Sequence, residues 1–222
     1  MENKYINEEM CAECKGACCK KGGCQYSTQD FESLKFEYLL KKLNEGYISI
    51  VAALDPRVIN GRKVMYTHLY IKSRNEGRPI IDLYSLRTRC SALTEVGCKY
   101  DVDNRPSGGI NLVPAQDENG RCCYPETDPM EYIKMWEPHQ TVLRRLVKHF
   151  TGKTVENQLR EDIYNLFTSI FYQRFEGVSP EEIESVLGDQ LMLSTYFEDV
   201  VIKAINDYIK VNGKLPQKVR TR

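Results

Sequence analysis

Five of the nine cysteines in this chain fall within its first 24 residues, in the pattern Cys11-x2-Cys14-x3-Cys18-Cys19-x4-Cys24. Thiols at such short spacing bind a soft or borderline metal, form disulfides or carry out redox chemistry. The other four cysteines also occur in close sets: Cys90, Cys98, Cys122 and Cys123. Because no cysteine lies beyond residue 123, the sequence divides into a cysteine-bearing first part and a cysteine-free last part.

Disulfides are the less favoured use of these thiols. The N-terminal residues lack the apolar stretch of a secretory signal, and no segment is long and apolar enough to cross a bilayer. We therefore expect a cytoplasmic protein, and disulfides rarely persist in that compartment. An odd number of cysteines would also leave one thiol over. The lysine, glycine and glutamine residues around the first five cysteines are unlike the apolar surroundings of core cysteines.

The charge balance indicates which partners to expect. The chain has 31 basic and 31 acidic residues, so its net charge gives no reason to expect nucleic acid or an anionic membrane. The cysteines predict a metal ion as the partner. A protein partner or a protein substrate stays open.

The residues that follow the N-terminal cysteines predict a helix and then a small antiparallel sheet. Residues 27–30, Ser-Thr-Gln-Asp, are typical of a helix start, and apolar residues at helical spacing continue to Leu43 before Gly46 ends the run. Residues 47–54 and 64–71 favour strands, and Asn60-Gly61 between them is a hairpin turn signal. Residues 79–84 are a candidate third strand.

Residues 87–128 are rich in glycine and proline and lack periodicity, which is unusual in a compact domain unless something else orders them. Metal ligation would supply that order, because four cysteines lie inside this stretch. From residue 129 the pattern becomes helical, with apolar stripes that end at Gly152, run over 154–176, restart at Ser179-Pro180 and close at Asn212-Gly213. We predict an α+β protein: a metal-binding cysteine region with a small antiparallel sheet over 1–128, and a helical region over 129–222 packed on it as one compact unit.

The spacing of the cysteines predicts the metal ligands. A C-x2-C pair turns two thiolates toward one ion about 2.3 Å from each sulfur, and the neighbouring lysines would offset the negative charge. Adjacent cysteines diverge, so the two vicinal pairs allow either one or two metal sites. The predicted ligands are Cys11, Cys14, Cys18, Cys19, Cys90 and Cys98. The further candidates are Cys24, Cys122 and Cys123. Zinc and an iron–sulfur centre both accept all-cysteine ligation, so the choice between zinc and iron stays open.

These residues resemble a known family. The first four cysteines, the segment Arg89-Cys90-Ser91-Ala92-Leu93, the segment Gly97-Cys98-Lys99-Tyr100 and Arg105-Pro106 match in order. Over about residues 10–125 the chain is similar to the CxxCxxCC zinc- or iron-chelating domain of the YkgJ-family cysteine-cluster proteins. Against that motif, one extra residue precedes Cys18, and Gly109 stands where the family commonly has the cysteine of an RPxxC pattern. Cys24, Cys122 or Cys123 is then the replacement for that ligand.

The resemblance leaves the activity open. The family includes flagellin lysine-N-methylase, which implies that methyl transfer is conceivable, although most members have no assigned activity. Three hypotheses follow: a metal-binding protein, an enzyme that uses the centre for methyl transfer or redox chemistry, and a structural zinc module that presents a partner-binding surface. No P-loop, GxSxG or HExxH motif is present, and catalytic residues stay unassigned. We expect His68 to be a sheet residue and Trp136 to be a packing residue, and we assign no histidine to the metal.

Overall fold

The computed structural model describes the conformation of most of the chain. The described residues are 19, 24–74, 78–87, 89–90, 92–94, 97–99, 105–110, 115–116, 122–123, 129–178 and 180–217. They confirm the predicted α+β class, with a small antiparallel sheet and several helices.

The sheet has three strands in the order β1-β3-β2, where β1 is Gln25–Tyr26, β2 is Ile48–Ile59 and β3 is Arg62–Ser73. Strands β2 and β3 form the predicted hairpin, antiparallel from the Ile48–Ser73 pair to the Ile59–Arg62 pair. Its turn residues Asn60 and Gly61 have φ values of 51° and 74°, as the Asn-Gly signal predicted. His68 lies on β3 opposite Ala53, which confirms it as a sheet residue.

The prediction of a third strand at residues 79–84 was wrong: the third strand is β1, which pairs with β3, and residues 79–84 form no regular strand. Residues 80–83 instead run parallel to β2 and form one isolated bridge, between Ile50 and Ile81. The N–H of Ala52 donates to the Leu83 carbonyl at 3.0 Å, but the N–H of Leu83 donates to Asp162 Oδ2 at 2.8 Å. This long-range hydrogen bond diverts the segment from the sheet toward the helical part.

The helix predicted from residue 27 is interrupted. Ser27 and Asp30 form a capping box, but it encloses only the 3-10 turn Thr28–Asp30, labelled η1. Phe31 is extended, with φ −123° and ψ 132°, and its ring packs against Tyr26 and Trp136. Helix α3 follows at Phe36–Asn44, and Gly46 ends it with φ 85°, as expected.

Short elements occupy the described parts of the glycine- and proline-rich stretch. They are β4 (Leu93–Thr94), β5 (Gly97–Cys98), α4 (Ser107–Ile110), β6 (Ala115–Gln116) and β7 (Cys122–Cys123). Strand β4 pairs with β5, and β6 pairs with β7, both antiparallel. The stretch therefore holds only two-residue strands and a single helical turn among the residues that can be described.

The last part of the chain is helical, as predicted. Its elements are α5 (Pro129–Trp136), η3 (Glu137–His139), α6 (Gln140–Thr151), α7 (Val155–Phe171), α8 (Pro180–Gly188), α9 (Gln190–Tyr196) and α10 (Glu198–Asn212). Gly152 and Gly213 end α6 and α10 in the left-handed conformation, with φ values of 70° and 68°. Two boundaries differ from the prediction: α7 ends at Phe171 rather than at residue 176, and Phe197 separates α9 from α10.

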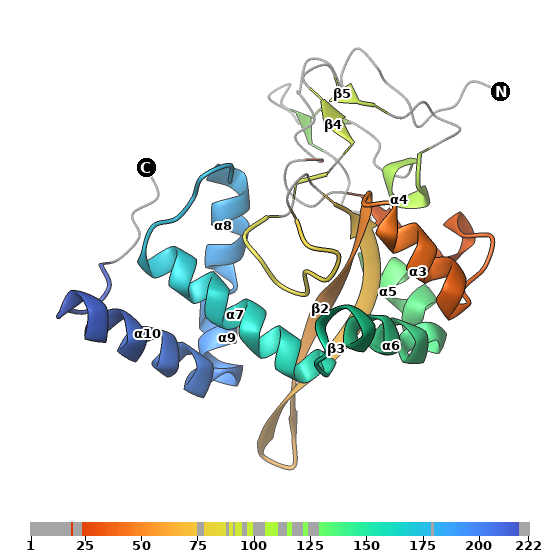
Figure 1. Cartoon of the computed structure of the whole chain (residues 1–222). Coiled ribbons are helices and arrows are strands. Elements are labelled where there is room, and N and C mark those ends of the chain that lie inside the picture. The colour runs from red at the N-terminus through yellow and green to blue at the C-terminus, as the bar shows by residue number, and fades with distance from the viewer. Residues whose placement is uncertain are drawn as a thin grey trace.

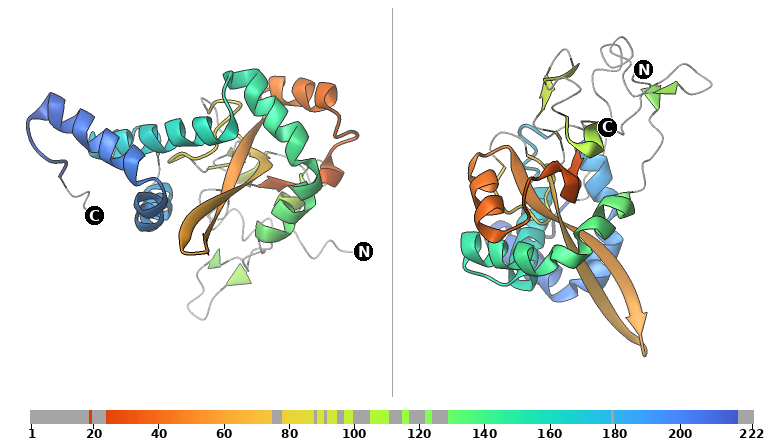
Figure 2. Two further views of the ribbon diagram at one scale, coloured as in Figure 1. Left: turned by 90° about the horizontal axis from the view of Figure 1, so that it is seen from below. Right: turned by 90° about the vertical axis from the view of Figure 1, so that its right-hand side faces the viewer.

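Helices lie on both sides of the long hairpin (Figures 1 and 2). Helices α3, α5 and α6 cover one side, while α7, α8, α9 and α10 lie on the other. One hydrophobic cluster contains buried residues of the sheet and of both helical groups, including Ile50, Leu69, Trp136 and Ile163. The tip of the hairpin projects from this core, where Val58 is 65% exposed. Among the described residues, no helix combines the length and apolar character needed to span a membrane.

Candidate metal centre

A second, smaller cluster of buried side chains lies apart from the main core and consists of Cys24, Cys90 and Ala92. The sulfur atoms of Cys24 and Cys90 are 3.3 Å apart, and both residues are free thiols. Cys24 is 4% exposed and Cys90 is 1% exposed. Cys19 and Cys98 are partly buried and pack against this cluster. Four thiols from distant parts of the sequence therefore come together.

Ser73, at the end of β3, positions the two central thiols. Its N–H donates to the Cys24 carbonyl at 2.9 Å, and its hydroxyl accepts the N–H of Cys24 at 3.1 Å. The same hydroxyl lies 3.1 Å from the Cys90 sulfur, to which it can donate. Because Ser73 belongs to the paired sheet, the β1–β3 pairing determines where both sulfurs lie.

The described residues between Cys90 and Lys99 lie close to the cluster and are joined to it by backbone hydrogen bonds. The N–H of Cys90 donates to the Cys19 carbonyl at 2.7 Å, and the N–H of Ala92 reaches the Cys90 sulfur at 3.4 Å. The N–H of Lys99 donates to the Ala92 carbonyl at 2.8 Å, and Leu93 on β4 pairs with Cys98 on β5. These bonds hold the backbone of Cys19 and Cys98 next to that of Cys90.

Among these thiols, Cys19 and Cys24 donate hydrogen bonds and Cys90 accepts them. Hydrogen bonds from Cys19 and then from Cys24 lower the pKa of Cys90 far below that of a free thiol. The pKa of Cys24 is raised, first by its hydrogen bond to Cys90 and then by burial. Burial and the Arg78 guanidinium lower the pKa of Lys72 to about 8, while the charges of Cys24 and Cys90 oppose that shift. A thiolate that accepts several hydrogen bonds has the electronic character of a metal ligand.

The distances are those of hydrogen-bonded thiols. Two sulfurs on one zinc ion, each about 2.3 Å from it in tetrahedral geometry, would lie about 3.8 Å apart. The Cys24–Cys90 distance of 3.3 Å is shorter than that, and far longer than a disulfide bond of about 2.05 Å. Within the described part of the chain, no three His, Cys, Asp or Glu side chains are arranged to hold a metal ion. The donor set, buried soft sulfurs from separate segments, fits zinc or iron in kind.

The structure describes only some of the predicted ligands. Of the six first-named cysteines it brings together Cys19, Cys90 and Cys98, and it adds Cys24, which was only a further candidate. Cys11, Cys14 and Cys18 lie outside the described residues. The backbone of Cys122 and Cys123 is described as β7, but their side chains are not. Sequence reasoning missed Ser73 and Lys72, since no local motif marks a strand residue that pairs with a distant cysteine.

Gly109, which stands where the resemblance implies a cysteine, lies directly beside Cys24. A Cβ atom at Gly109 would be 3.6 Å from both the Cβ and the sulfur of Cys24, which is ordinary van der Waals contact. The adjacent Gly108 differs, because its Cβ would lie only 2.3 Å from the Gln25 carbonyl oxygen. Asp30 fixes helix α4 in this position by accepting the Ser107 N–H at 3.0 Å and the Ser107 hydroxyl at 2.7 Å.

The other residues with candidate chemistry lie in packing positions. Trp136 is fully buried, and its indole N–H donates to the Tyr26 carbonyl at 2.8 Å, which confirms it as a packing residue. The ring of His139 packs against Trp136, and the ring of His149 packs against Phe36.

Comparisons of the chain with protein-family models, with curated proteins and with solved structures found no match. The functional interpretation therefore depends on the residues of the site itself.

Proposed function

We propose that this chain is a metal-binding protein in which a cysteine-thiolate cluster holds zinc or an iron–sulfur centre. The observation that carries the proposal is the approach of Cys24 and Cys90 to 3.3 Å as free, buried thiols, with Cys19 and Cys98 packed against them. Buried thiols that converge from separate segments are typical of metal ligation, because sulfur binds such ions strongly and the bonds join chain segments. Zinc would supply structural order there, and an iron–sulfur centre would supply electron transfer.

The proposed ligand set contains Cys19, Cys24, Cys90 and Cys98, and the undescribed Cys11, Cys14 and Cys18 are available for a second site. Cys24 replaces the cysteine of the RPxxC pattern that this chain lacks. A side chain at Gly109, where that cysteine would stand, would contact the Cys24 sulfur, so both positions serve the same place in the site. Lys72 would offset part of the negative charge of a thiolate centre, since its pKa responds to the charges of Cys24 and Cys90.

The burial of the central thiols favours a structural centre over a catalytic one. Cys24 is 4% exposed and Cys90 is 1% exposed, whereas a catalytic metal needs an open position for water or substrate. Methyl transfer, which the resemblance implies, stays a prediction from the sequence. We also propose a cytoplasmic location, in which the reducing environment keeps these thiols free.

Anaerobic purification with elemental analysis and a visible spectrum tests the proposal. We expect at least one zinc or iron centre per chain. An iron–sulfur cluster would absorb at about 400 nm, whereas zinc would leave the protein colourless. The Cys24→Ser variant should lose metal. Metal content well below one per chain in the anaerobic wild-type protein would overturn the proposal.

A pair of variants tests the ligand set separately. Adding Gly109→Cys to Cys24→Ser should restore metal binding, because the new side chain would start 3.6 Å from residue 24. Gly108→Cys is the matched control, since its Cβ would meet the Gln25 backbone at 2.3 Å and cannot restore the site. Retention of metal by Cys24→Ser together with its loss in Cys122→Ser would show that Cys122, and not Cys24, is the replacement ligand.

A further inference from the structure

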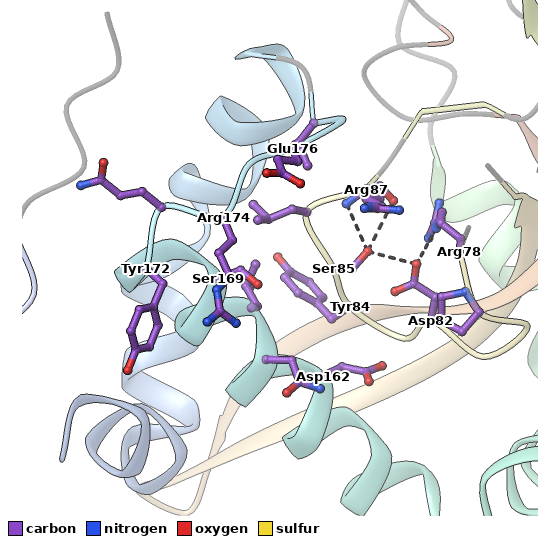
Figure 3. A pocket seen from close by; sticks show the side chains of 16 residues that line it. Arg78, Asp82, Tyr84, Ser85, Arg87, Asp162, Ser169, Tyr172, Arg174 and Glu176 are labelled. Atoms are coloured by element: carbon purple, nitrogen blue, oxygen red, sulfur yellow. Dashed lines mark hydrogen bonds and ion pairs between the residues drawn. The ribbon is translucent and has the colours of Figure 1, made fainter. Parts of the chain in front are cut away.

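A cavity of about 880 Å³ lies between residues 78–87 and the C-terminal end of α7, apart from the thiols (Figure 3). Its volume is in the range of small-molecule binding sites, about 300–1,000 Å³. Part of its wall is apolar and includes Leu86, Leu166 and Val178. The polar part of the wall contains three arginines: Arg78, Arg87 and Arg174.

Arg78 is the unusual member of this wall. It is only 7% exposed, and its Nε donates to the Asp82 carboxylate in a buried ion pair. Its Nη1 is buried and has no hydrogen-bond partner among the described residues. A buried guanidinium N–H without an acceptor is costly, so a group that supplies an acceptor would be bound favourably at Arg78.

Among the described residues, three carboxylates line the cavity: Asp82 and Asp162 are engaged within the protein, and Glu176 is exposed. Asp82 accepts the Ser85 hydroxyl at 3.0 Å in addition to the Arg78 Nε. Asp162 accepts the N–H of Leu83 and the side-chain amide of Gln158, both at 2.8 Å. Neither Asp82 nor Asp162 is therefore free to supply the acceptor that Arg78 Nη1 lacks, and the Arg78 Nη1 atom has no bond to Glu176.

Arg87 and Arg174 are exposed and add positive charge to the mouth of the cavity. The backbone N–H of Arg87 donates to the Ser85 hydroxyl at 3.1 Å, which joins Arg87 to the Asp82–Arg78 pair through a short chain of hydrogen bonds. Figure 3 shows these residues toward one end of the cavity and Arg174 with Tyr172 toward the other. Guanidinium groups pair best with planar or tetrahedral oxyanions.

We propose that this cavity binds a small organic oxyanion, a carboxylate or a phosphate ester. Arg78 and Arg87 donate to the oxyanion, and Leu86, Leu166 and Val178 contact the apolar body of the molecule. The site is independent of the proposed metal centre, since it uses none of the cysteines.

Titration of the purified protein with inorganic phosphate and with succinate tests the proposal, with potassium chloride at matched ionic strength as the reference. Calorimetry or the melting temperature reports binding. We expect saturable binding of at least one of the two anions, and the anion that binds identifies the chemical class. A response that potassium chloride reproduces, or no saturable response to either anion, would overturn the proposal.

Arg87→Gln is the principal variant, because Arg87 is exposed and its loss leaves no buried partner behind. It should weaken anion affinity roughly ten-fold or more, since charge-assisted hydrogen bonds are the stronger kind. Arg62→Gln, on the exposed hairpin tip, is the matched control and should leave the affinity unchanged. Unchanged affinity in Arg87→Gln would refute the assignment of Arg87.

Arg78 needs a paired substitution. Arg78→Gln alone leaves the buried Asp82 without its ion-pair partner, so the double variant Arg78→Gln with Asp82→Asn keeps the site neutral. The folded double variant should also lose anion binding, whereas full binding by this variant would exclude Arg78 from the site.

Discussion

Gly108 and Gly109 are neighbours in α4, yet a methyl group would meet very different surroundings at the two positions. At Gly108 the added Cβ would lie 2.3 Å from the oxygen and 2.7 Å from the nitrogen of Gln25. At Gly109 the nearest atoms would be 3.6 Å away. Gly108→Ala should therefore destabilise the protein, and Gly109→Ala should not.

The distances at Gly108 indicate how much stability the Gly108→Ala variant should lose. Restoring ordinary contact of at least 3.4 Å at Gly108 would require a displacement of about 1 Å of α4 or β1. Strand β1 is held by its antiparallel pairing with β3, and the Ser73 N–H also donates to the carbonyl of the preceding Cys24 at 2.9 Å. Such overpacking typically costs about 1–3 kcal/mol, which lowers the folding equilibrium constant roughly 5- to 150-fold. Gly109→Ala should be neutral or stabilising by up to about 1 kcal/mol, because alanine restricts the unfolded chain.

Urea denaturation followed by tryptophan fluorescence measures this difference. The chain has a single tryptophan, and the indole of Trp136 donates to the carbonyl of Tyr26, next to Gln25. With a denaturant slope of about 2 kcal/mol/M, Gly108→Ala should lower the urea midpoint by about 0.5–1.5 M relative to the unmodified protein. Equal midpoints for the two variants would refute the close approach of α4 to β1.

Two further predictions concern buried polar groups. Trp136→Phe removes the indole N–H that donates to the Tyr26 carbonyl and leaves a small cavity, so it should cost about 1–3 kcal/mol in urea denaturation followed by circular dichroism; an unchanged midpoint would contradict this. Burial raises the pKa of Asp162 from 3.8 to about 6, so the folded protein holds the proton more tightly and this carboxyl contributes less stability as pH rises from about 4 to 6. This loss of stability is at most about 3 kcal/mol, and the partial exposure of Asp162 reduces it. Asp162→Asn should remove this component of the pH dependence of stability. A pH profile of stability identical to that of the unmodified protein would contradict the prediction.

Local sequence signals predicted the parts of the fold that depend on local conformation. Asn60-Gly61 predicted the hairpin turn, and both residues have positive φ values. Gly152 predicted the end of α6, and Thr154 caps α7 by accepting the N–H of Asn157. Each signal depends on residues within one turn of one another, so no distant partner is needed to decide it.

Two predictions failed where residues distant in the sequence decide the local conformation. Residues 79–84 have strand-favouring composition, but the Asp162 carboxylate, 79 positions away from Leu83, accepts the backbone N–H of that residue. The helix predicted from residue 27 stops because Phe31 packs against Tyr26 and Trp136 and because Asp30 binds Ser107. Tertiary contacts outweigh a local propensity of less than about 1 kcal/mol per residue.

The sequence by itself determined the chemistry available to this protein: nine thiols crowded before residue 124, a neutral net charge and the local turns and caps. Only the tertiary structure decided which thiols meet. Cys24 and Cys90 are 66 positions apart, and their sulfurs come within 3.3 Å because β1 pairs with β3 and Ser73 bonds to both residues. The arginine-lined cavity likewise exists only where residues 78–87 meet α7. Spacing along the chain specifies local conformation, but sheet pairing and burial specify the distances between remote side chains.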